Sequence, residues 1–241
     1  MNDRDNIYIS DKVKHISFAF DEEVTRVFPD MISRSVPGYK SSLNIITDYA
    51  RRYIQSDSII YDLGCSLGAA TDCLLPFAGE TNKIIAIDNS ISMINLCKDR
   101  FNKSINSGQV IFFNKDIRRL EFKTTSFVVI NYLLQFLEIK ERHSLLTNIF
   151  SSLVSGGVCI LSEKVHFESS SKTSYISDIH HKFKSINGYT DLEIARKRDA
   201  LEGVLFTETE GQHLNRLKKI GFSRVNIVMS NLNFITMACI K

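Results

Sequence analysis

The feature that most constrains the fold of this chain is a glycine-punctuated turn that directly follows an apolar strand. The strand, residues 58–61, runs into the sequence Tyr61-Asp62-Leu63-Gly64-Cys65-Ser66-Leu67-Gly68-Ala69, which opens a helix. Gly64 has no Cβ and lets the chain turn sharply, Gly68 lets the helix pack close to the strand, and Ser66 is small enough for the backbone to approach a ligand. Such strand–turn–helix junctions are typical of nucleotide-binding folds.

An acidic residue follows at a suitable distance. A second apolar strand, residues 83–87, ends in Asp88, 24 residues after Gly64, near the offset of ~20 residues at which a carboxylate accepts hydrogen bonds from ribose hydroxyls. Ser66 replaces the middle glycine of a dinucleotide fingerprint, which disfavours a pyrophosphate and hence NAD. The pattern resembles the first two motifs of class I S-adenosylmethionine-dependent transferases. The alternative is an ordinary turn with a solvated Asp88.

Composition favours one large α/β domain, since the 241 residues are 44% hydrophobic and 24% charged. A net charge of +3 does not indicate a phosphate-tracking surface, so no direct nucleic-acid binding is expected. The five cysteines lie far apart without Cys-x-x-Cys spacing, so we expect neither a disulfide framework nor a metal site. Free cysteines fit a reducing cytoplasm. The charged N-terminus lacks an apolar signal core, and we expect neither export nor a membrane span.

Strand signals alternate with helical patterns, which predicts βαβ units and a parallel sheet. The five recurring apolar segments are residues 59–64, 83–88, 109–116, 127–133 and 158–163. Segments 225–230 and 233–240 are joined so closely that only a hairpin can connect them. The predicted fold is therefore an α/β class I methyltransferase-like (Rossmann-like) sheet of seven strands, mostly parallel, with a C-terminal antiparallel hairpin strand and helices on both faces.

Two segments lie outside this common core: an N-terminal extension, residues 1 to about 42, and an insertion, residues 165 to about 203. The insertion is predicted to be helical, because Thr190 and Glu193 have capping-box spacing and Gly203 can close a helix. A second capping box is predicted at Thr207 and Glu210. We predict a single domain whose substrate specificity resides in these two segments.

Polar residues at the carboxyl ends of the strands are the candidates for ligand binding. They are Asp88, Asn89, Asp116, Ile117, Asn131, Glu163 and Lys164. Asp116 is suited to accept a hydrogen bond from an adenine amino group while Ile117 covers the ring; the alternative is a helix N-cap before Arg118. Asn131 is equally consistent with a ligand contact or a turn, and an ion pair between Glu163 and Lys164 is favoured over an acid/base pair.

Arg198 is a candidate for anion binding. On the predicted helix it shares a face with the apolar Ile194 and Leu201, while Arg196 and Lys197 point elsewhere. An arginine on an apolar stripe often has an anionic partner, although snorkelling across the stripe is equally consistent. The histidines lack companion metal ligands and are expected to be surface or satisfied residues: His166, His180 and His181.

Motifs across nearly the whole chain resemble those of carboxy-S-adenosyl-L-methionine synthases. They are residues 28–39 (FPDMISRSVPGY), 61–71, 84–90, 134–138, 161–164 and the His180-His181 to Asn187-Gly188-Tyr189 segment. The first and last lie in the two segments that generic methyltransferases lack, so the resemblance is specific. It implies ligand contacts, to S-adenosylmethionine or its carboxylated form, at Tyr39, Gly64, Cys65, Ser66, Asp88, Asn89, Asp116, Ile117, Asn131 and Arg198.

The resemblance also implies the reaction. Prephenate and S-adenosylmethionine give carboxy-S-adenosylmethionine and phenylpyruvate, and a separate transferase uses the product to carboxymethylate wobble uridine in tRNA. In the implied mechanism prephenate loses carbon dioxide and its ring hydroxyl, the hydroxyl takes a proton from the sulfonium methyl, and the resulting ylide captures the carbon dioxide, so no protein base is obligatory. Arg198 and the Tyr39 hydroxyl would bind the new carboxylate, and a homodimer is implied.

Two other functions remain open from the sequence. The cofactor motifs alone would favour an ordinary methyltransferase that acts on a small molecule or tRNA, and Arg198 and Tyr39 argue against it. The absence of a convincing acid/base dyad also permits a non-catalytic adenosyl-ligand binding protein or a partner of a tRNA enzyme. Turnover of prephenate discriminates both from the synthase.

Overall fold

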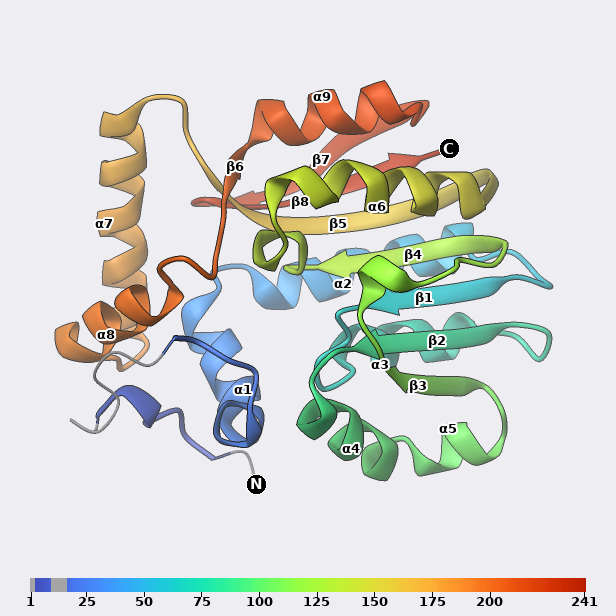
Figure 1. Cartoon of the computed structure of the whole chain (residues 1–241), viewed down its shortest axis with the longest axis horizontal. Coiled ribbons are helices and arrows are strands. Elements are labelled where there is room, and N and C mark those ends of the chain that lie inside the picture. Colours follow the sequence, from blue (N-terminus) through green and yellow to red (C-terminus); the bar gives the residue numbers. More distant parts are fainter. Residues whose placement is uncertain (1–2, 10–16) are drawn as a thin grey trace.

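The computed structural model describes residues 3–9 and 17–241, and its centre is a twisted sheet of seven strands, with a short eighth strand paired to the end of β5 (Figure 1). The strand order is β3-β2-β1-β4-β5-β8-β7, and β6 pairs with β5 alone. The strands are β1 (Ile59–Leu63), β2 (Lys83–Asp88), β3 (Val110–Asn114), β4 (Thr125–Asn131), β5 (Leu153–His166), β6 (Glu208–Thr209), β7 (Arg224–Asn231) and β8 (Phe234–Ile240).

The predicted topology is confirmed. Strands β1 to β5 pair in parallel, whereas β8 runs antiparallel to both β5 and β7. Only Leu232 and Asn233 separate β7 from β8, and Leu232 adopts a φ of 54° in this tight hairpin. Strand β5 begins earlier than predicted, because Leu153 already pairs with Thr125 before a register shift, and β6 was not predicted.

Helices cover both faces of the sheet. Helices α2 (Tyr39–Tyr53), α3 (Ala69–Leu74) and α4 (Ile91–Arg100) pack on one face, and α6 (Ile139–Ser152) and α9 (Glu210–Ile220) pack on the other. The remaining helices are α1 (Glu22–Ser35), α5 (Asn102–Asn106), α7 (Ser170–Ile186), α8 (Asp191–Leu201) and the short 3₁₀ turns η1 (Ile7–Ile9), η3 (Leu75–Phe77), η4 (Ile117–Arg119) and η5 (Leu134–Phe136). Burial of two apolar faces on one sheet is what holds the layers together.

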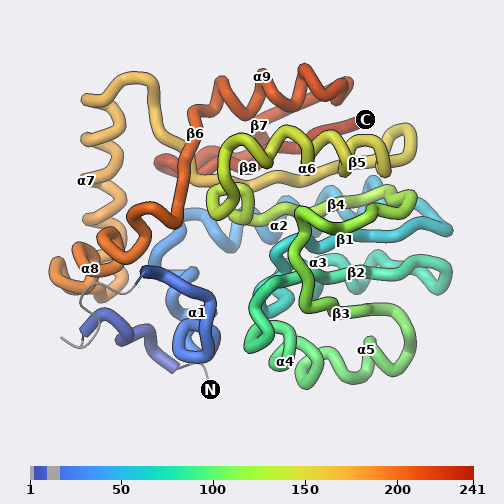
Figure 2. The backbone as a smooth tube through the Cα atoms, in the orientation of Figure 1, coloured from blue at the N-terminus to red at the C-terminus, as the bar shows by residue number. Residues whose placement is uncertain are grey.

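The two segments outside the common core meet at one edge of the sheet. Helix α1 comes from the N-terminal extension, of which residues 1–2 and 10–16 lie outside the described part, and α7 and α8 form the insertion. They stand together beside the carboxyl ends of the strands (Figure 1), and the tube in Figure 2 shows the N-terminal segment running beside α8. Two segments far apart in sequence therefore enclose the carboxyl ends of the strands, where ligands bind in open α/β sheets.

One predicted helix start is confirmed and one is wrong. Thr190 and Glu193 form the expected capping box of α8. The second box is at Thr209 and Gln212, two residues after the predicted position, because Glu208 and Thr209 first pair with β5 as strand β6. Within the described ranges, every helix is too short or too polar to cross a bilayer.

Candidate functional site

The glycine turn after β1 has the close contacts that the sequence predicted. Gly64 and Gly68 have φ values of 69° and 76°, and an added Cβ would lie 2.8 Å from Leu133 Cδ1 and 2.5 Å from Phe101 Cε2, respectively. Gly68 thus allows close approach of the residue that ends α4 rather than of the strand. Ser66 also has a positive φ, 48°, a strained conformation for a residue with a side chain and one found often at functional sites.

Asp88, at the end of β2, is hydrogen-bonded to this turn. Its carboxylate accepts hydrogen bonds from the backbone N–H of Ser66 and of Ser90, each at 2.9 Å. Burial raises the pKa of Asp88, and the backbone donors act in the opposite direction. The neighbouring Asp62 is fully buried, accepts a hydrogen bond from Thr71 Oγ1 at 2.7 Å, and has a pKa raised by burial to about 6. The turn is therefore rigidly held with carboxylate oxygens around it.

Asp116 forms the N-cap that the sequence left as an alternative. Its side chain accepts from the backbone N–H of Arg118 at 3.0 Å, and the Arg118 guanidinium binds the same carboxylate at 2.6 Å. Hydrogen bonding to Arg118 lowers the pKa of Asp116. The carboxylate stays ionised at the cavity wall, beside the buried Ile117.

The end of β4 holds unsatisfied polar atoms. Asn131 Oδ1 and Tyr132 Oη are both buried without a hydrogen-bond partner in the described structure, and Tyr132 has a φ of 61°. Buried polar atoms are almost always hydrogen-bonded, so two unsatisfied atoms on consecutive residues indicate a place where a ligand supplies the missing hydrogen-bond partners.

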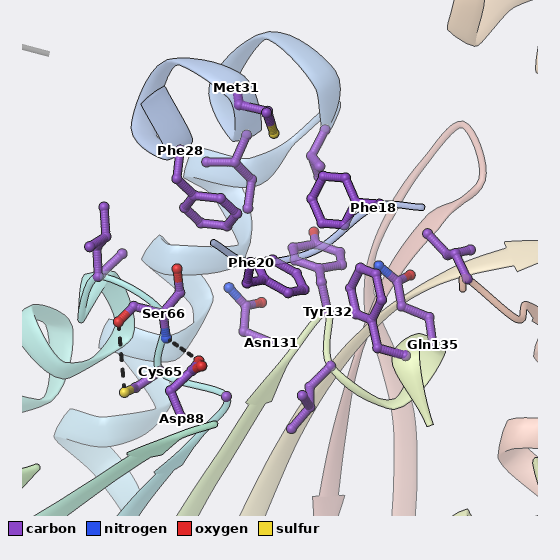
Figure 3. Close-up of a pocket in the computed structure, with 18 of the residues that line it drawn as sticks. Phe18, Phe20, Phe28, Met31, Cys65, Ser66, Asp88, Asn131, Tyr132 and Gln135 are labelled. Atoms are coloured by element: carbon purple, nitrogen blue, oxygen red, sulfur yellow. Dashed lines mark hydrogen bonds between the residues drawn. The ribbon is translucent and has the colours of Figure 1, made fainter. Parts of the chain in front are cut away.

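These residues line one cavity of about 930 Å³. In Figure 3 Ser66 and Asp88 lie on one side of it, while Phe18, Phe20 and Phe28 extend over it from the N-terminal extension. Nine of the ten residues predicted to bind ligand line this cavity: Tyr39, Gly64, Cys65, Ser66, Asp88, Asn89, Asp116, Ile117 and Asn131. We call the part around Gly64, Ser66, Asp88 and Asp116 the turn end.

An aromatic cluster covers the middle of the cavity. Phe136, in η5, lies edge-on to Phe20 with ring centroids 5.2 Å apart and is stacked with Phe18 at 6.4 Å. Tyr39 and Tyr132 approach each other on the opposite side at 6.3 Å. These rings come from three segments of the chain, and together they give the cavity an apolar lining.

Arg198 was predicted to lie on the buried face of its helix, and this placement is wrong. The Arg198 side chain is 64% exposed, pairs with Asp199 at 3.1 Å, and is not among the residues lining the cavity. Lys197 is instead buried, and its Nζ contacts Ser35 Oγ at 3.0 Å. The buried face of α8 includes Lys197 because the N-terminal extension supplies polar partners for its ammonium group. A pattern of apolar residues cannot predict burial of this kind.

The predicted ion pair of Glu163 and Lys164 is also wrong, because consecutive strand residues point to opposite faces. Glu163 is buried and accepts from the backbone N–H groups of Leu134 and Gln135 at 2.8 and 3.0 Å. Burial raises the pKa of Glu163 to about 8. Its role is to fix η5, whereas Lys164 points into the cavity.

Two of the three histidines considered in the sequence have hydrogen-bond partners, as predicted. His180 Nε2 donates to the backbone oxygen of Ser35 at 2.7 Å, and His166 Nδ1 contacts Thr207 Oγ1 at 2.9 Å. In residues 3–9 and 17–241, no group of three or more His, Cys, Asp or Glu side chains is arranged to hold a metal ion.

Sequence reasoning missed several residues that line the cavity. Lys184 and Lys197 join Lys164 at the side opposite the turn, and we call this the lysine end. Gln135 and the phenylalanines of the aromatic cluster were also missed. The spacing of Lys184 four residues after His180, on one face of α7, was an available signal, but nothing local showed that this face is buried.

Comparison with solved structures confirms the fold class. The chain is similar to a structure of human N-acetylserotonin methyltransferase in complex with SAM (TM-score 0.59, 14% identity, 91% of this chain and 55% of that chain). It is also similar to a SAM-dependent methyltransferase from Aquifex aeolicus (TM-score 0.58, 15% identity, 92% and 99%). A family model described as a methyltransferase domain matches residues 60–157.

Sequence relatives are closer and span the whole chain. A carboxy-S-adenosyl-L-methionine synthase from Shewanella sediminis is 45% identical over 99% of this chain and 98% of its own length. The synthase from Vibrio parahaemolyticus is 43% identical over 98% of this chain and 97% of its own length. Because the match includes both segments outside the methyltransferase core, the chain belongs to the carboxy-S-adenosyl-L-methionine synthase family.

Proposed function

We propose that this enzyme converts S-adenosylmethionine and prephenate to carboxy-S-adenosylmethionine and phenylpyruvate. The observation that carries the proposal is the single cavity that joins a carboxylate-rich turn end to an aromatic middle and a cationic end. An adenosyl ligand suits the first part, and a ring that bears carboxylates suits the other two. Membership of the family makes the chain an S-adenosylmethionine-dependent enzyme.

The turn end fits S-adenosylmethionine. Asp88 would accept hydrogen bonds from the ribose hydroxyls, and Asp116 and Ile117 would hold the adenine. The orphaned Oδ1 of Asn131 offers an acceptor to a donor such as the amino group of the methionine moiety. The backbone of Gly64 to Ser66 would lie along the ligand, since the glycine and the small serine leave it accessible.

The reaction balances without a protein base. Prephenate releases carbon dioxide and hydroxide, the S-adenosylmethionine methyl group gives one proton to that hydroxide and binds the carbon dioxide at its carbon, and the other products are phenylpyruvate and water. The role of the protein is to hold both molecules in contact and to keep bulk water out. The apolar lining of Phe18, Phe20 and Phe136 supports this role.

The product carries a carboxylate that S-adenosylmethionine lacks, and we infer that Tyr39 and Arg198 bind it. Tyr39 lines the cavity, but Arg198 of the same chain is exposed. An exposed arginine reaches such a site only when two copies associate, so the proposal includes a homodimer in which each copy supplies Arg198 to the other. We also propose a cytoplasmic enzyme whose product is used by a separate tRNA carboxymethyltransferase, with no tRNA bound here.

The experiment that tests the function is turnover with purified enzyme, S-adenosylmethionine and prephenate, in the absence of tRNA. We expect phenylpyruvate and a product with the mass of S-adenosylmethionine plus carbon dioxide. With a deuterated methyl group, one deuterium should be lost per product. Transfer of an intact methyl group to another acceptor, with prephenate untouched, would mean an ordinary methyltransferase, and binding without any turnover would mean a non-catalytic protein.

A further inference from the structure

Three lysines from three different elements meet at the lysine end of the cavity. Lys164 is on β5, Lys184 on α7 and Lys197 on α8. Lys184 is 8% exposed and Lys197 is 6% exposed. Lysines are almost never buried to this degree unless a partner neutralises the ammonium group, because loss of hydration disfavours the charge.

The carboxylates nearby do not balance these charges. Lys197 Nζ lies 3.6 Å from Asp5 Oδ2. Neither Lys164 nor Lys184 forms an ion pair with any carboxylate in residues 3–9 or 17–241, and Lys164 Nζ lies 6.0 Å from the centre of the Phe234 ring. The lysine end therefore has three ammonium groups and one carboxylate.

Neighbouring groups do not supply the missing negative charge. His180 donates its Nε2 proton to Ser35, and burial lowers its pKa to about 3, so it is neutral. The nearby Arg34 and Asp30 form their own pair at 2.6 Å. Burial and the charges of Lys164 and Lys197 together lower the pKa of Lys184 to about 7. A bound anion would favour the charged form of Lys184 and raise this pKa.

An aromatic surface adjoins the three lysines. The Tyr132 and Phe234 rings lie edge-on with centroids 5.9 Å apart, and the Tyr132 hydroxyl is one of the two buried polar atoms without a hydrogen-bond partner at the end of β4. Tyr132 lines the same cavity as the three lysines, so this hydroxyl can donate a hydrogen bond to a carboxylate there. The cavity thus combines flat apolar surface with donors and positive charge.

We propose that Lys164, Lys184 and Lys197 form the subsite that binds the carboxylates of the second substrate, a ring-bearing dicarboxylate, with its ring against the aromatic cluster. The inference rests on the proposed function and adds the residues that select this substrate. A second source of the same chemistry exists, because S-adenosylmethionine itself carries an amino-acid carboxylate. The experiment therefore measures the two ligands separately.

The main variant is Lys184→Met, which keeps an unbranched side chain one atom shorter and removes its charge. Lys182→Met is the matched control, since Lys182 lies on the same helix and is exposed. Binding of prephenate to enzyme saturated with S-adenosylhomocysteine is measured by calorimetry, and binding of S-adenosylhomocysteine alone is measured in parallel. Lys164→Met provides a second, independent variant.

For Lys184→Met we expect prephenate to bind about tenfold to a hundredfold more weakly, the range for loss of a charge-assisted hydrogen bond. Affinity for S-adenosylhomocysteine should be unchanged, as should both affinities in Lys182→Met. The folded variant should melt at the same or a higher temperature, because an uncompensated buried charge has been removed.

Several outcomes would overturn the inference. One is an unchanged affinity for prephenate in both Lys184→Met and Lys164→Met. Another is an equal loss of affinity for prephenate and for S-adenosylhomocysteine, which would assign the lysines to the amino-acid carboxylate. A wild-type enzyme that does not bind prephenate would also exclude the subsite. The proposed function fails on a different result, namely prephenate that binds at the lysine end but is not consumed with S-adenosylmethionine.

Discussion

The turn end and the lysine end of the cavity offer opposite chemistry to a ligand. At the turn end, acceptors dominate: Asp88 and Asp116 are anchored by backbone N–H groups and by Arg118. At the lysine end, donors dominate, and Lys184 is buried without a carboxylate partner in the described chain. The turn end is complete within the methyltransferase core, whereas the lysine end needs the N-terminal extension and the insertion. In our proposal, the shared fold therefore binds S-adenosylmethionine and the added segments select the second substrate.

The largest effect is expected from Asp88→Ala. It removes a partly buried carboxylate that accepts two backbone hydrogen bonds and, in our proposal, two more from the ribose, so affinity for S-adenosylhomocysteine should fall by about 3–6 kcal/mol, at 1.5–3 kcal/mol per charge-assisted bond. Calorimetry of the folded variant measures this loss. Asp99→Ala, an exposed change on α4, is the control. Wild-type affinity in Asp88→Ala would place the adenosyl group elsewhere and contradict the role of the turn end as its binding site.

Arg142→Met tests whether the two ends are structurally independent. Arg142 is fully buried, contacts Glu208 at 2.6 Å, and donates to the backbone oxygens of Leu137 and Phe206 beside η5. Its loss leaves a buried carboxylate with only Arg216, so the free energy of unfolding should fall by about 3–5 kcal/mol.

Denaturant unfolding measures that change, with Lys140→Met on the same helix as a control, because the exposed Lys140 pairs only with the exposed Glu138. Affinity for S-adenosylhomocysteine should not change at a temperature where the variant is folded. A parallel loss of that affinity would show that the turn end also depends on this buried pair.

Arg198→Ala sharpens the assignment of the product carboxylate. Affinity for carboxy-S-adenosylmethionine should fall by about 1.5–3 kcal/mol, or tenfold to a hundredfold, while affinity for S-adenosylhomocysteine stays constant. Because Arg198 is exposed in its own chain, the effect should appear only under conditions where light scattering detects a dimer. Equal losses for the two ligands, or a selective loss in a monomer, would contradict the proposed role.

The smallest effect concerns stability against pH. Lys184 loses its proton at about pH 7 in the folded protein but near pH 10.4 when unfolded. Between these values the unfolded chain binds more protons, so stability should rise with pH; the penalty is fully present below pH 7.

After burial, the charges of Lys164 on β5 and Lys197 on α8 also lower this pKa, and Lys197 is itself paired with Asp5. His180 and His181 of α7 face Lys184 as well. Lys184→Met should flatten the rise and make the protein more stable than the wild type at pH 6. Denaturant midpoints at pH 6 and pH 9 measure both quantities. An unchanged slope would mean that Lys184 keeps an ordinary pKa.

Local patterns were sufficient for the turn end. The Gly64 turn, Asp88 and the hairpin of β7 and β8 each depend on residues close in sequence or on strand order, so the fold and the acceptor residues could be predicted. The lysine end could not, because the burial of Lys197 depends on Asp5 and Ser35, which lie far away in sequence. For the same reason Arg198 was assigned to the wrong face of α8.

The contacts of Asp5 also set an order of events during synthesis. Asp5 accepts from the hydroxyl of Tyr189, which lies 184 residues later, and its backbone oxygen accepts from Arg34 at 2.7 Å. Since a chain emerges from the ribosome N-terminus first, this segment must wait until α8 has left the ribosome before it can dock, whereas β1 and β2 can already pair. The part of the molecule made first is thus among the last to reach its native position, and contacts of such high sequence separation slow folding.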